Sequence, residues 1–155
     1  MKISLSAPHF FGNELYNLKK CVKKGWISSS GSIETDFEKR VKNYIGAKYA
    51  LGIINCTSAL QLSVRLLNPK PKDEIIVPSI TFIASVNAII YNSCKPIFLD
   101  CDENLLLDTQ KTLEFLKTQT FQYKGDCYNK KTKKKILAII AVHTYPRWRI
   151  WWKYC

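Results

Sequence analysis

The sequence predicts an α/β fold built on a mostly parallel β-sheet. Short apolar or β-branched runs occur at Glu74–Val77, Pro96–Leu99 and Leu137–Val142. They alternate with segments of about ten residues whose apolar side chains recur at helical spacing. Strands that alternate with helices in this way form βαβ units with parallel strands. Ligands of such sheets bind beyond the carboxyl ends of the strands, so we expect the functional residues there.

Length and composition are those of a soluble globular domain. The chain has 155 residues, of which 46% are hydrophobic and 23% charged, enough for one real core. No signal-peptide pattern follows Met1, and the longest apolar run, Ile136–Val142, is too short to cross a bilayer, so we expect a cytoplasmic protein. The six cysteines form no C-x-x-C pair and are not spaced with His9 or His143 as zinc ligands would be, which predicts free thiols and no metal site.

The net charge of +12 is concentrated in particular segments. Residues 117–135 carry seven lysines against the single acid Asp126, and four more lysines cluster on an early amphipathic helix. Lysines on the polar face of such a helix form an ordinary solvated surface. Because no helix-turn-helix, zinc-finger or RNP-type pattern accompanies the charge, we expect no nucleic-acid partner.

Helices are predicted on both sides of the central part of the chain. The first begins at Asn13-Glu14 and is closed by Gly25, and Thr35 with Glu38 reads as a capping box for a second helix that ends at Gly46. Two later helices are expected at Thr81–Tyr91, with Phe82, Val86, Ile89 and Ile90 facing inward, and at Thr109–Gln119, with Leu113 and Leu116 buried. The lysine-rich segment after them is expected to be a loop.

The stretch Tyr49–Leu67 is the centre of the prediction. Its apolar run Tyr49–Ile54 predicts a short buried strand, and a helix is expected to begin close to Thr57. The N-terminus of a helix carries free backbone N–H groups and a partial positive charge, so Thr57 and Ser58 fit a phosphate site. An ordinary N-cap explains the same residues, because caps are commoner than anion sites. Both interpretations stay open here.

Three expected strand ends carry polar or aromatic candidates for one site. They are Asn55–Ser58, Ser79–Phe82 and Asp100–Asp102. In a parallel sheet these ends meet at one edge, so we expect the three segments to converge.

Residues 146–155 read PRWRIWWKYC and fit neither a strand nor a helix period. One interpretation is a tail that binds membranes or stacks on nucleic acid. We favour the other, an aberrant tail produced by a frameshift, because no helix or strand follows Leu137–Val142 to complete its βαβ unit. The expected organisation is one partial domain over residues 1–145, followed by this tail. Leu137–Val142 is then expected to expose an unpaired edge, which favours aggregation.

The pattern GNELYNLKKCVKKGWISSSGSIETDFEKRVKNYIGAKYALGIINCTSALQL, followed by DEIIVPSITFIASVNAIIYNSCKPIFLDCD, resembles the N-terminal part of the DegT/DnrJ/EryC1/StrS aminotransferases. These are PLP-dependent sugar aminotransferases of fold type I, and the similarity runs from about Leu5 to Tyr145. The resemblance implies that residues 1–145 are a partial N-terminal, PLP-binding domain. This is the three-layer large domain of that fold, truncated, with a mostly parallel sheet. The insert GDCYNKKTKKKILAIIAVH resembles the branch that acts on nonulosonic, legionaminic-type sugars.

The resemblance also implies roles for individual residues. Thr57 and Ser58 would hold the phosphate of pyridoxal 5′-phosphate (PLP), which agrees with the helix-end argument. Phe82 would stack on the pyridine ring, although core packing at a helix start explains it equally well. The N-terminal helix and the loop Gly25–Gly31 would lie near the nucleotide-sugar pocket of a homodimer.

The resemblance leaves the catalytic machinery incomplete. The family's aspartate at the pyridinium nitrogen and its Ser-x-x-Lys lysine have no matching positions here, so no catalytic residue is assigned and PLP could not attach covalently at a matching lysine. We expect an inactive fragment of an enzyme that moves an amino group from an amino-acid donor, glutamate, to a keto nucleotide sugar in surface-polysaccharide biosynthesis. The alternative is a non-catalytic phosphate-binding or accessory protein that docks on a full-length homologue.

Overall fold

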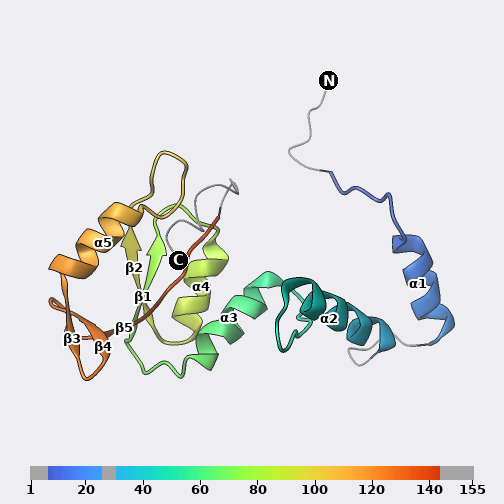
Figure 1. Cartoon of the computed structure of the whole chain (residues 1–155), viewed down its shortest axis with the longest axis horizontal. Helices are drawn as coiled ribbons and strands as arrows, with labels where there is room; N and C mark the ends of the chain where they lie inside the picture. The colour runs from blue at the N-terminus through green and yellow to red at the C-terminus, as the bar shows by residue number, and fades with distance from the viewer. Residues whose placement is uncertain (1–6, 26–30, 144–155) are drawn as a thin grey trace. The chain divides into compact units, whose positions relative to one another are not determined.

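A computed structural model describes residues 7–25 and 31–143 of the chain (Figure 1). The chain divides into two compact units, Met1–Gly52 and Ile53–Cys155. Most of the predicted loop at Gly25–Gly31 and the whole tail at 146–155 lie outside the described residues, so what the sequence predicts for them stays a prediction. In the part that is described, no helix combines the length and the apolar character needed to span a membrane.

The first unit contains two helices, α1 (Glu14–Lys23) and α2 (Ser32–Ile45). The first helix begins and ends where the sequence predicts, and Gly25 follows it with a φ of 65°. Neither helix has a buried residue. The apolar side chains that set their helical period are therefore exposed within this unit: Leu15, Leu18, Val22, Phe37, Tyr44 and Ile45.

The predicted capping box at the start of α2 is wrong. The helix begins three residues earlier than Thr35, with Gly31 as its N-cap. Thr35 therefore lies inside the helix, where its hydroxyl donates to the Gly31 carbonyl oxygen over 3.3 Å. Glu38 does not return to a cap but accepts a hydrogen bond of 2.8 Å from the backbone N–H of Gly52. The carboxylate thus anchors the chain beyond the helix rather than its beginning.

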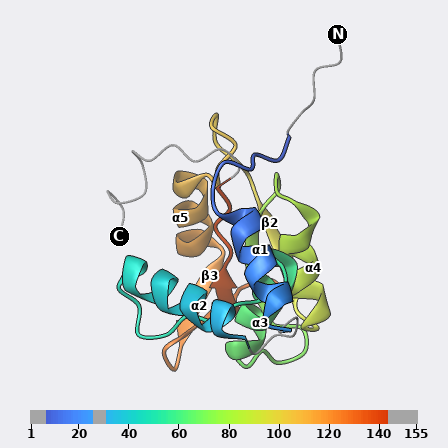
Figure 2. The same ribbon diagram turned by 90° about the vertical axis from the view of Figure 1, so that its right-hand side faces the viewer.

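The second unit is an α/β sandwich. Its elements in chain order are α3 (Cys56–Leu66), β1 (Glu74–Pro78), α4 (Ile83–Tyr91), β2 (Lys95–Leu99), α5 (Thr109–Thr118), β3 (Thr120–Tyr123), β4 (Asp126–Asn129) and β5 (Lys135–Ile139). The sheet order is β2-β1-β5-β4-β3, with β2, β1 and β5 parallel and the β3–β4 hairpin antiparallel. Helices α3 and α4 lie on one face and α5 on the other (Figures 1 and 2). The predicted α/β fold with a mostly parallel sheet is confirmed.

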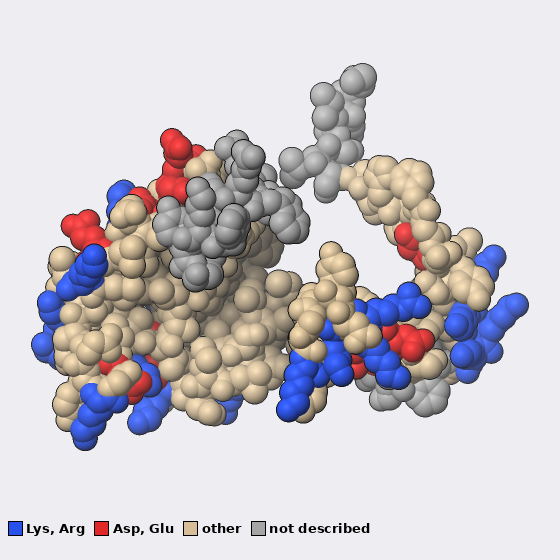
Figure 3. Space-filling view, viewed as in Figure 1, with Lys and Arg blue, Asp and Glu red and all other residues tan. Residues whose placement is uncertain are grey.

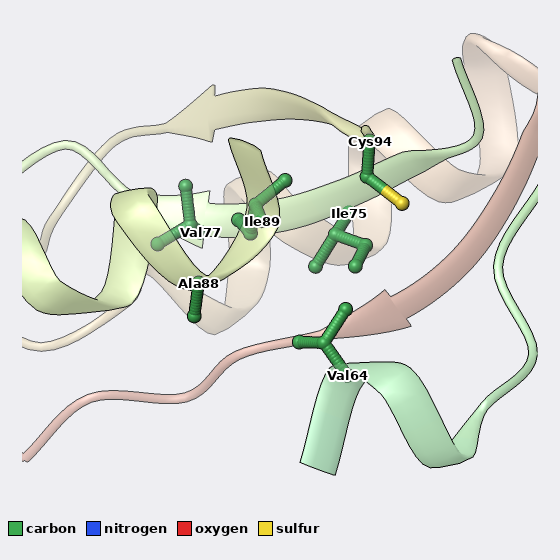
Figure 4. Close-up of a cluster of buried hydrophobic side chains, with 6 residues drawn as sticks. All are labelled: Val64, Ile75, Val77, Ala88, Ile89 and Cys94. Carbon is green, nitrogen blue, oxygen red and sulfur yellow. The ribbon is translucent and has the colours of Figure 1, made fainter. Parts of the chain in front are cut away.

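Strand β1 forms the centre of this unit and is buried at every residue. Alternate side chains of a strand point to opposite faces, so Ile75 and Val77 face one way and Ile76 the other. Figure 4 shows Ile75 and Val77 packed with side chains from α3 and α4. The members of this cluster are Val64, Ile75, Val77, Ala88, Ile89 and Cys94. Such a residue pattern on a strand is typical of a parallel sheet covered on both faces.

The predicted buried strand at Tyr49–Ile54 does not form. The segment has no strand pairing, and the side chain of Ile54 is 90% exposed. A strand needs a neighbour that takes its backbone N–H and C=O groups, and none of the five strands of the described sheet pairs with this segment. Apolar composition alone therefore could not specify the strand.

The predicted inner faces of two helices need correction. Helix α4 begins two residues after Thr81, and Ile90 is 52% exposed although Val86 and Ile89 are buried as expected. On α5, Leu113 is exposed, whereas the buried residue is Thr112, whose hydroxyl donates to the Asp108 carbonyl oxygen over 2.7 Å. Both helices form as predicted, but fewer of their apolar side chains are buried than the sequence predicted.

The lysine-rich segment is a β-hairpin and not the predicted loop. Strands β3 and β4 pair from Thr120↔Asn129 to Tyr123↔Asp126, around a two-residue turn in which Lys124 and Gly125 have φ values of 50° and 84°. Lysine side chains gather over this hairpin, at the opposite end of the sheet from the acidic loop after β2 (Figure 3). The one acid of the hairpin, Asp126, lies 2.6 Å from the Lys135 ammonium group, and this hydrogen bond raises the pKa of Lys135.

A buried polar contact ties the hairpin to the first strand of the sheet. The side-chain amide of Asn129 donates to Glu74 Oε2 over 2.9 Å, and both residues are buried. The amide oxygen of Asn129 accepts from the backbone N–H of Lys131 over 2.9 Å. One side chain therefore closes the turn before β5 and supplies a hydrogen-bond donor to a carboxyl group that is removed from water.

Ile89 and Ile90 provide a test of the core. Replacing the fully buried Ile89 with alanine should lower the free energy of unfolding by about 2 to 5 kcal/mol, because it leaves a cavity. Ile90→Ala makes the same substitution in the same helix at a half-exposed position, and it should lower the free energy of unfolding by less than about 1 kcal/mol. Urea unfolding followed by circular dichroism measures both. Equal losses would contradict the described burial.

Cys94 makes stability depend on alkaline pH. Burial, and next the nearby charge of Asp73, raise the pKa of its thiol. Because the folded state favours the neutral thiol, Cys94 contributes to the free energy of unfolding. That contribution is complete below the pKa of an unfolded thiol, about 8.5, and is lost as pH rises through the higher pKa of the folded state. The free energy of unfolding, measured with a reductant present, should therefore fall above that pH. Cys94→Ala should flatten the slope, whereas Cys56→Ala, at an exposed thiol, should not.

Candidate functional site

The N-terminus of α3 has two backbone N–H groups to offer. Asn55 is the N-cap, and its side-chain oxygen accepts from the Ser58 N–H over 2.8 Å. Its carbonyl oxygen accepts from the Ala59 N–H over 3.1 Å. Within the described part of the chain, the N–H groups of Cys56 and Thr57 have no hydrogen-bond acceptor. The predicted N-cap is therefore real and leaves donors free for a ligand.

The hydroxyl groups of Thr57 and Ser58 are also uncommitted. In the described residues, neither hydroxyl makes a hydrogen bond to the protein. Other helical hydroxyl groups behave differently: Ser63 donates to the Ala59 carbonyl oxygen over 2.8 Å and Thr118 to that of Glu114 over 2.8 Å. Two unbonded hydroxyl groups next to two free N–H groups form a cluster of four donors. A phosphate group, which has several strong acceptor oxygens, matches that cluster.

Charge distinguishes this helix end from that of α5. The first turn of α3 contains no acidic residue. At α5 the N-cap is Asp108, whose carboxylate accepts from the Lys111 N–H over 3.0 Å. A carboxylate there satisfies the helix end and repels a further anion. The start of α5 is therefore closed to phosphate, whereas the start of α3 is open to it.

Two of the three predicted strand ends lie together. Strands β1 and β2 are parallel neighbours, and beyond them the Ser79 N–H donates to the Leu99 carbonyl oxygen over 2.8 Å. The Ser79 hydroxyl lies 3.9 Å from Cys101 Sγ. The third segment, Asn55–Ser58, follows no strand, so its predicted place at a strand end is wrong. It belongs instead to α3, which packs against α4.

Phe82 is the N-cap residue of α4, and its side chain is 77% exposed. Core packing, the alternative explanation of this residue, therefore does not hold in the described structure. Its carbonyl oxygen accepts from the Ser85 N–H over 3.0 Å, which uses the backbone and leaves the ring free. In the described part of the chain, no hydrogen bond or ring contact joins Phe82 to Thr57 or Ser58. An exposed ring at a helix start can stack on a flat ligand.

The acidic segment after β2 is used for local structure. Asp100 binds the ammonium group of Lys111, and that hydrogen bond lowers the pKa of Asp100 and raises the pKa of Lys111. Asp102 Oδ1 accepts from the backbone N–H groups of Asn104 and Leu106 over 2.9 and 3.0 Å. The sequence did not predict these partners. Lys111 lies in the first turn of α5 and is separated from Asp100 by the loop after β2. These carboxylates shape the loop instead of meeting the donors of α3.

The sequence matches the DegT/DnrJ/EryC1/StrS aminotransferase family over residues 11–147. The chain belongs to that family. The match covers both units, and it confirms the resemblance of the two sequence patterns. The aminotransferases of this family bind PLP, a phosphorylated cofactor. The first turn of α3, which contains Thr57 and Ser58, has no acidic residue.

Curated relatives of the chain include enzymes that are named for nucleotide sugars. The GDP-perosamine synthase of Caulobacter vibrioides is 41% identical over 145 residues, which are 93% of this chain and 35% of that protein. The dTDP-3-amino-3,6-dideoxy-alpha-D-galactopyranose transaminase of Aneurinibacillus thermoaerophilus is 36% identical over 104 residues, 66% of this chain and 28% of that protein. The chain thus spans only about a third of the length of the relatives it matches.

Solved structures give the same result for the fold. A protein from Streptococcus pneumoniae, described as a sugar aminotransferase and solved in PLP and PMP forms, matches with a TM-score of 0.67 and 26% identity. The match covers 74% of this chain and 29% of that protein. It confirms that this chain has part of the fold of the PLP-dependent sugar aminotransferases.

The residues present fit the phosphate end of PLP. The donors at the start of α3 match a phosphate group, and the exposed ring of Phe82 suits a flat heterocycle. When bound, PLP supplies an electron sink for chemistry at an amino-acid carbon. The Ser-x-x-Lys pattern in which the resemblance places the family's attached lysine does not occur among the 155 residues.

Proposed function

We propose that this chain is the cofactor-phosphate-binding part of a sugar aminotransferase that works in the cytoplasm. The complete enzyme, a homodimer, moves an amino group from an amino-acid donor, glutamate, to a keto nucleotide sugar for surface-polysaccharide biosynthesis. The chain by itself is inactive in that reaction. The family match and the sugar-modifying relatives support the reaction class.

The donor cluster at the start of α3 carries this proposal. The N–H groups of Cys56 and Thr57 and the hydroxyl groups of Thr57 and Ser58 are all donors without a protein acceptor in the described residues. Hydrogen bonds to charged groups contribute about 1.5 to 3 kcal/mol each, more than bonds between neutral groups. Phe82 adds a stacking surface for the ring. Together these groups bind and orient the cofactor, and an acid and a lysine from other sequence are needed for catalysis.

A phosphate probe without an aldehyde tests the site on this chain. Pyridoxine 5′-phosphate keeps the ring and phosphate of the cofactor but cannot react with surface lysines. We expect it to bind the wild-type chain in ligand-observed NMR. The double variant Thr57→Val with Ser58→Ala removes two charge-assisted hydrogen bonds and should bind at least about tenfold more weakly. Pyridoxine without the phosphate should not bind.

Ser63→Ala is the matched control. Ser63 lies on the same helix, and its hydroxyl donates to the Ala59 carbonyl oxygen, so its loss should leave the affinity unchanged. If wild type and the Thr57/Ser58 variant bind the probe equally, or if pyridoxine binds as well as its phosphate ester, the phosphate site is not at α3.

A second candidate function is an accessory role on a full-length homologue. Exposed apolar side chains along α1, such as Leu15, Leu18 and Val22, favour it because isolated soluble units seldom leave a whole helix face uncovered. The two candidates differ in one measurement. Mixing the chain with the Caulobacter vibrioides relative should yield a mixed oligomer under the accessory role, and light scattering would detect it.

A further inference from the structure

One face of the β3–β4 hairpin carries three aromatic rings in a row. Residues that pair directly across two antiparallel strands point to the same face, so Phe121 and its partner Tyr128 share one face. Tyr123, two residues after Phe121, lies on that face as well. The ring centroids of Phe121 and Tyr128 are 5.6 Å apart, and those of Tyr123 and Tyr128 are 6.2 Å apart. Tyr123 is 55% exposed and the other two rings are half-buried, so the row reaches the surface.

An exposed lysine lies at each end of this row. Lys124 Nζ, in the turn of the hairpin, is 5.4 Å from the centroid of the Tyr123 ring. Lys133 Nζ, in the connection to β5, is 5.5 Å from the centroid of the Phe121 ring. Each ammonium group therefore lies over a ring of the row. These residues form what we call the aromatic–lysine strip: Lys124, Tyr123, Tyr128, Phe121 and Lys133.

Hydrogen bonds of Asn129 close the connection between β4 and β5. Its backbone N–H donates to the Lys134 carbonyl oxygen over 2.9 Å, and its carbonyl oxygen accepts from the Lys133 N–H over 2.9 Å. Its side-chain oxygen accepts from the Lys131 N–H over 2.9 Å. The side chains of these three lysines are exposed. A backbone that is ordered before binding presents the ammonium groups at a lower entropic cost.

Most of the positive charge of this segment is not neutralised within the protein. Residues 117–135 contain seven lysines, no arginine and one acid, Asp126, which lies 2.6 Å from the Lys135 ammonium group. Among the described residues, four exposed lysines of the segment have no ion pair, and we call them the four unpaired lysines: Lys124, Lys131, Lys133 and Lys134. Like charges that lie close together repel each other, and an anionic partner relieves that repulsion.

The hairpin lies away from the residues that follow the carboxyl end of β1. Asn129 binds Glu74, the first residue of that strand, whereas Ser79 and Phe82 follow its last residue. The lysines over the hairpin and the acidic loop after β2 lie at opposite ends of the sheet (Figure 3). A partner on the aromatic–lysine strip would therefore leave Phe82 uncovered.

The side chains of the strip favour one class of anionic partner. The planar guanidinium of arginine suits bidentate recognition of bases and carboxylates, but this segment uses only lysine, whose ammonium group acts as a point charge. Ammonium groups and a neighbouring ring already occupy ring faces on which single-strand-binding proteins stack bases. A lipid surface requires neither feature. It attracts each lysine through charge, and tyrosine rings lie well at the level of the headgroups.

We propose that the aromatic–lysine strip docks this protein on a membrane surface rich in anionic phospholipids. The four unpaired lysines contact headgroup phosphates, and the exposed ring of Tyr123 enters the headgroup layer. The contact is peripheral and reversible, because it rests on charge and on a few rings at the surface. It does not involve the donor cluster at the start of α3.

Vesicle flotation with the full chain tests the proposal, since aggregated protein does not float. We expect the chain to float with vesicles made of equal parts of phosphatidylglycerol and phosphatidylcholine. Vesicles of phosphatidylcholine alone carry no net charge and should bind at least about tenfold more weakly. Raising the salt from about 0.15 M to about 1 M shortens the Debye length from about 8 to about 3 Å and should release the chain. Equal binding to both kinds of vesicle would contradict the proposal.

A charge-matched pair of variants locates the contact. The strip variant changes the four unpaired lysines to glutamine and should bind the mixed vesicles at least about tenfold more weakly. Its control removes the same charge from four exposed lysines on and next to α1 and should keep the affinity: Lys19→Gln, Lys20→Gln, Lys23→Gln and Lys24→Gln. If the strip variant loses its circular dichroism spectrum, Lys131→Gln with Lys134→Gln, which touches no ring of the strip, takes its place.

Two further variants separate charge from the shape of the side chains. Changing the four unpaired lysines to arginine keeps the charge and should keep the affinity for mixed vesicles. Tyr123→Ala keeps every charge and should weaken binding about threefold, because the ring no longer enters the headgroup layer. Unchanged binding of Tyr123→Ala would remove the ring from the proposed contact.

Three outcomes would overturn the proposal. The first is no flotation of the wild-type chain with mixed vesicles. The second is an equal loss in the α1 control, which makes net charge and not the strip the cause. The third is DNA binding that the strip variant loses, with release of the chain from vesicles by oligothymidylate at equal phosphate concentration, which makes nucleic acid the partner. Pyridoxine 5′-phosphate should bind the strip variant and the wild type equally, so a failure of the phosphate site appears separately.

Discussion

Complete burial of β1 is the constraint on which the second unit depends. Ile75 and Val77 need cover from α3 and α4, and Ile76 needs cover from the opposite face. A strand buried on both faces also needs a neighbour on each side, because its backbone groups cannot reach water. Parallel pairing with β2 and β5 meets that need. The positions of the α3 start and of the β1 end, where the donors and Phe82 lie, follow from this packing.

The sequence specified elements wherever local pattern and tertiary environment agree. Glu74–Val77 is apolar, β-branched and stopped by Pro78, and it is a strand in the structure. Tyr49–Ile54 has a similar pattern but no partner, so it forms no strand. The β3–β4 hairpin was missed although Phe121 and Tyr123 alternate with polar residues before Lys124-Gly125, because the surrounding lysines resemble a loop. Strand formation depends on a neighbour, and a single sequence segment does not contain it.

The candidate site was predictable in its residues and not in its geometry. Small hydroxyl residues before a helical period indicated Thr57 and Ser58. Which donors at this helix end stay free depends on the acceptors that the folded chain places beside them: the Asn55 side chain takes the Ser58 N–H and neither hydroxyl group. Asp100 and Asp102 looked equally suitable in the sequence, but contacts with Lys111 and with backbone N–H groups engage them in the loop. Only the folded structure shows which polar residues at strand ends are free to bind a ligand and which ones stabilise a loop.

The contact between Asn129 and Glu74 has a consequence for the order in which the unit forms. The two residues are 55 positions apart, so the start of β1 keeps an uncompensated carboxyl group until the hairpin has been added. Contacts of such separation slow folding, because the intervening loop must close first. On a ribosome, helices α3, α4 and α5 would emerge before the residue that completes the strand between them. Nascent chains that stop short of Asn129 would therefore lack the buried hydrogen-bond donor of Glu74 at the start of β1.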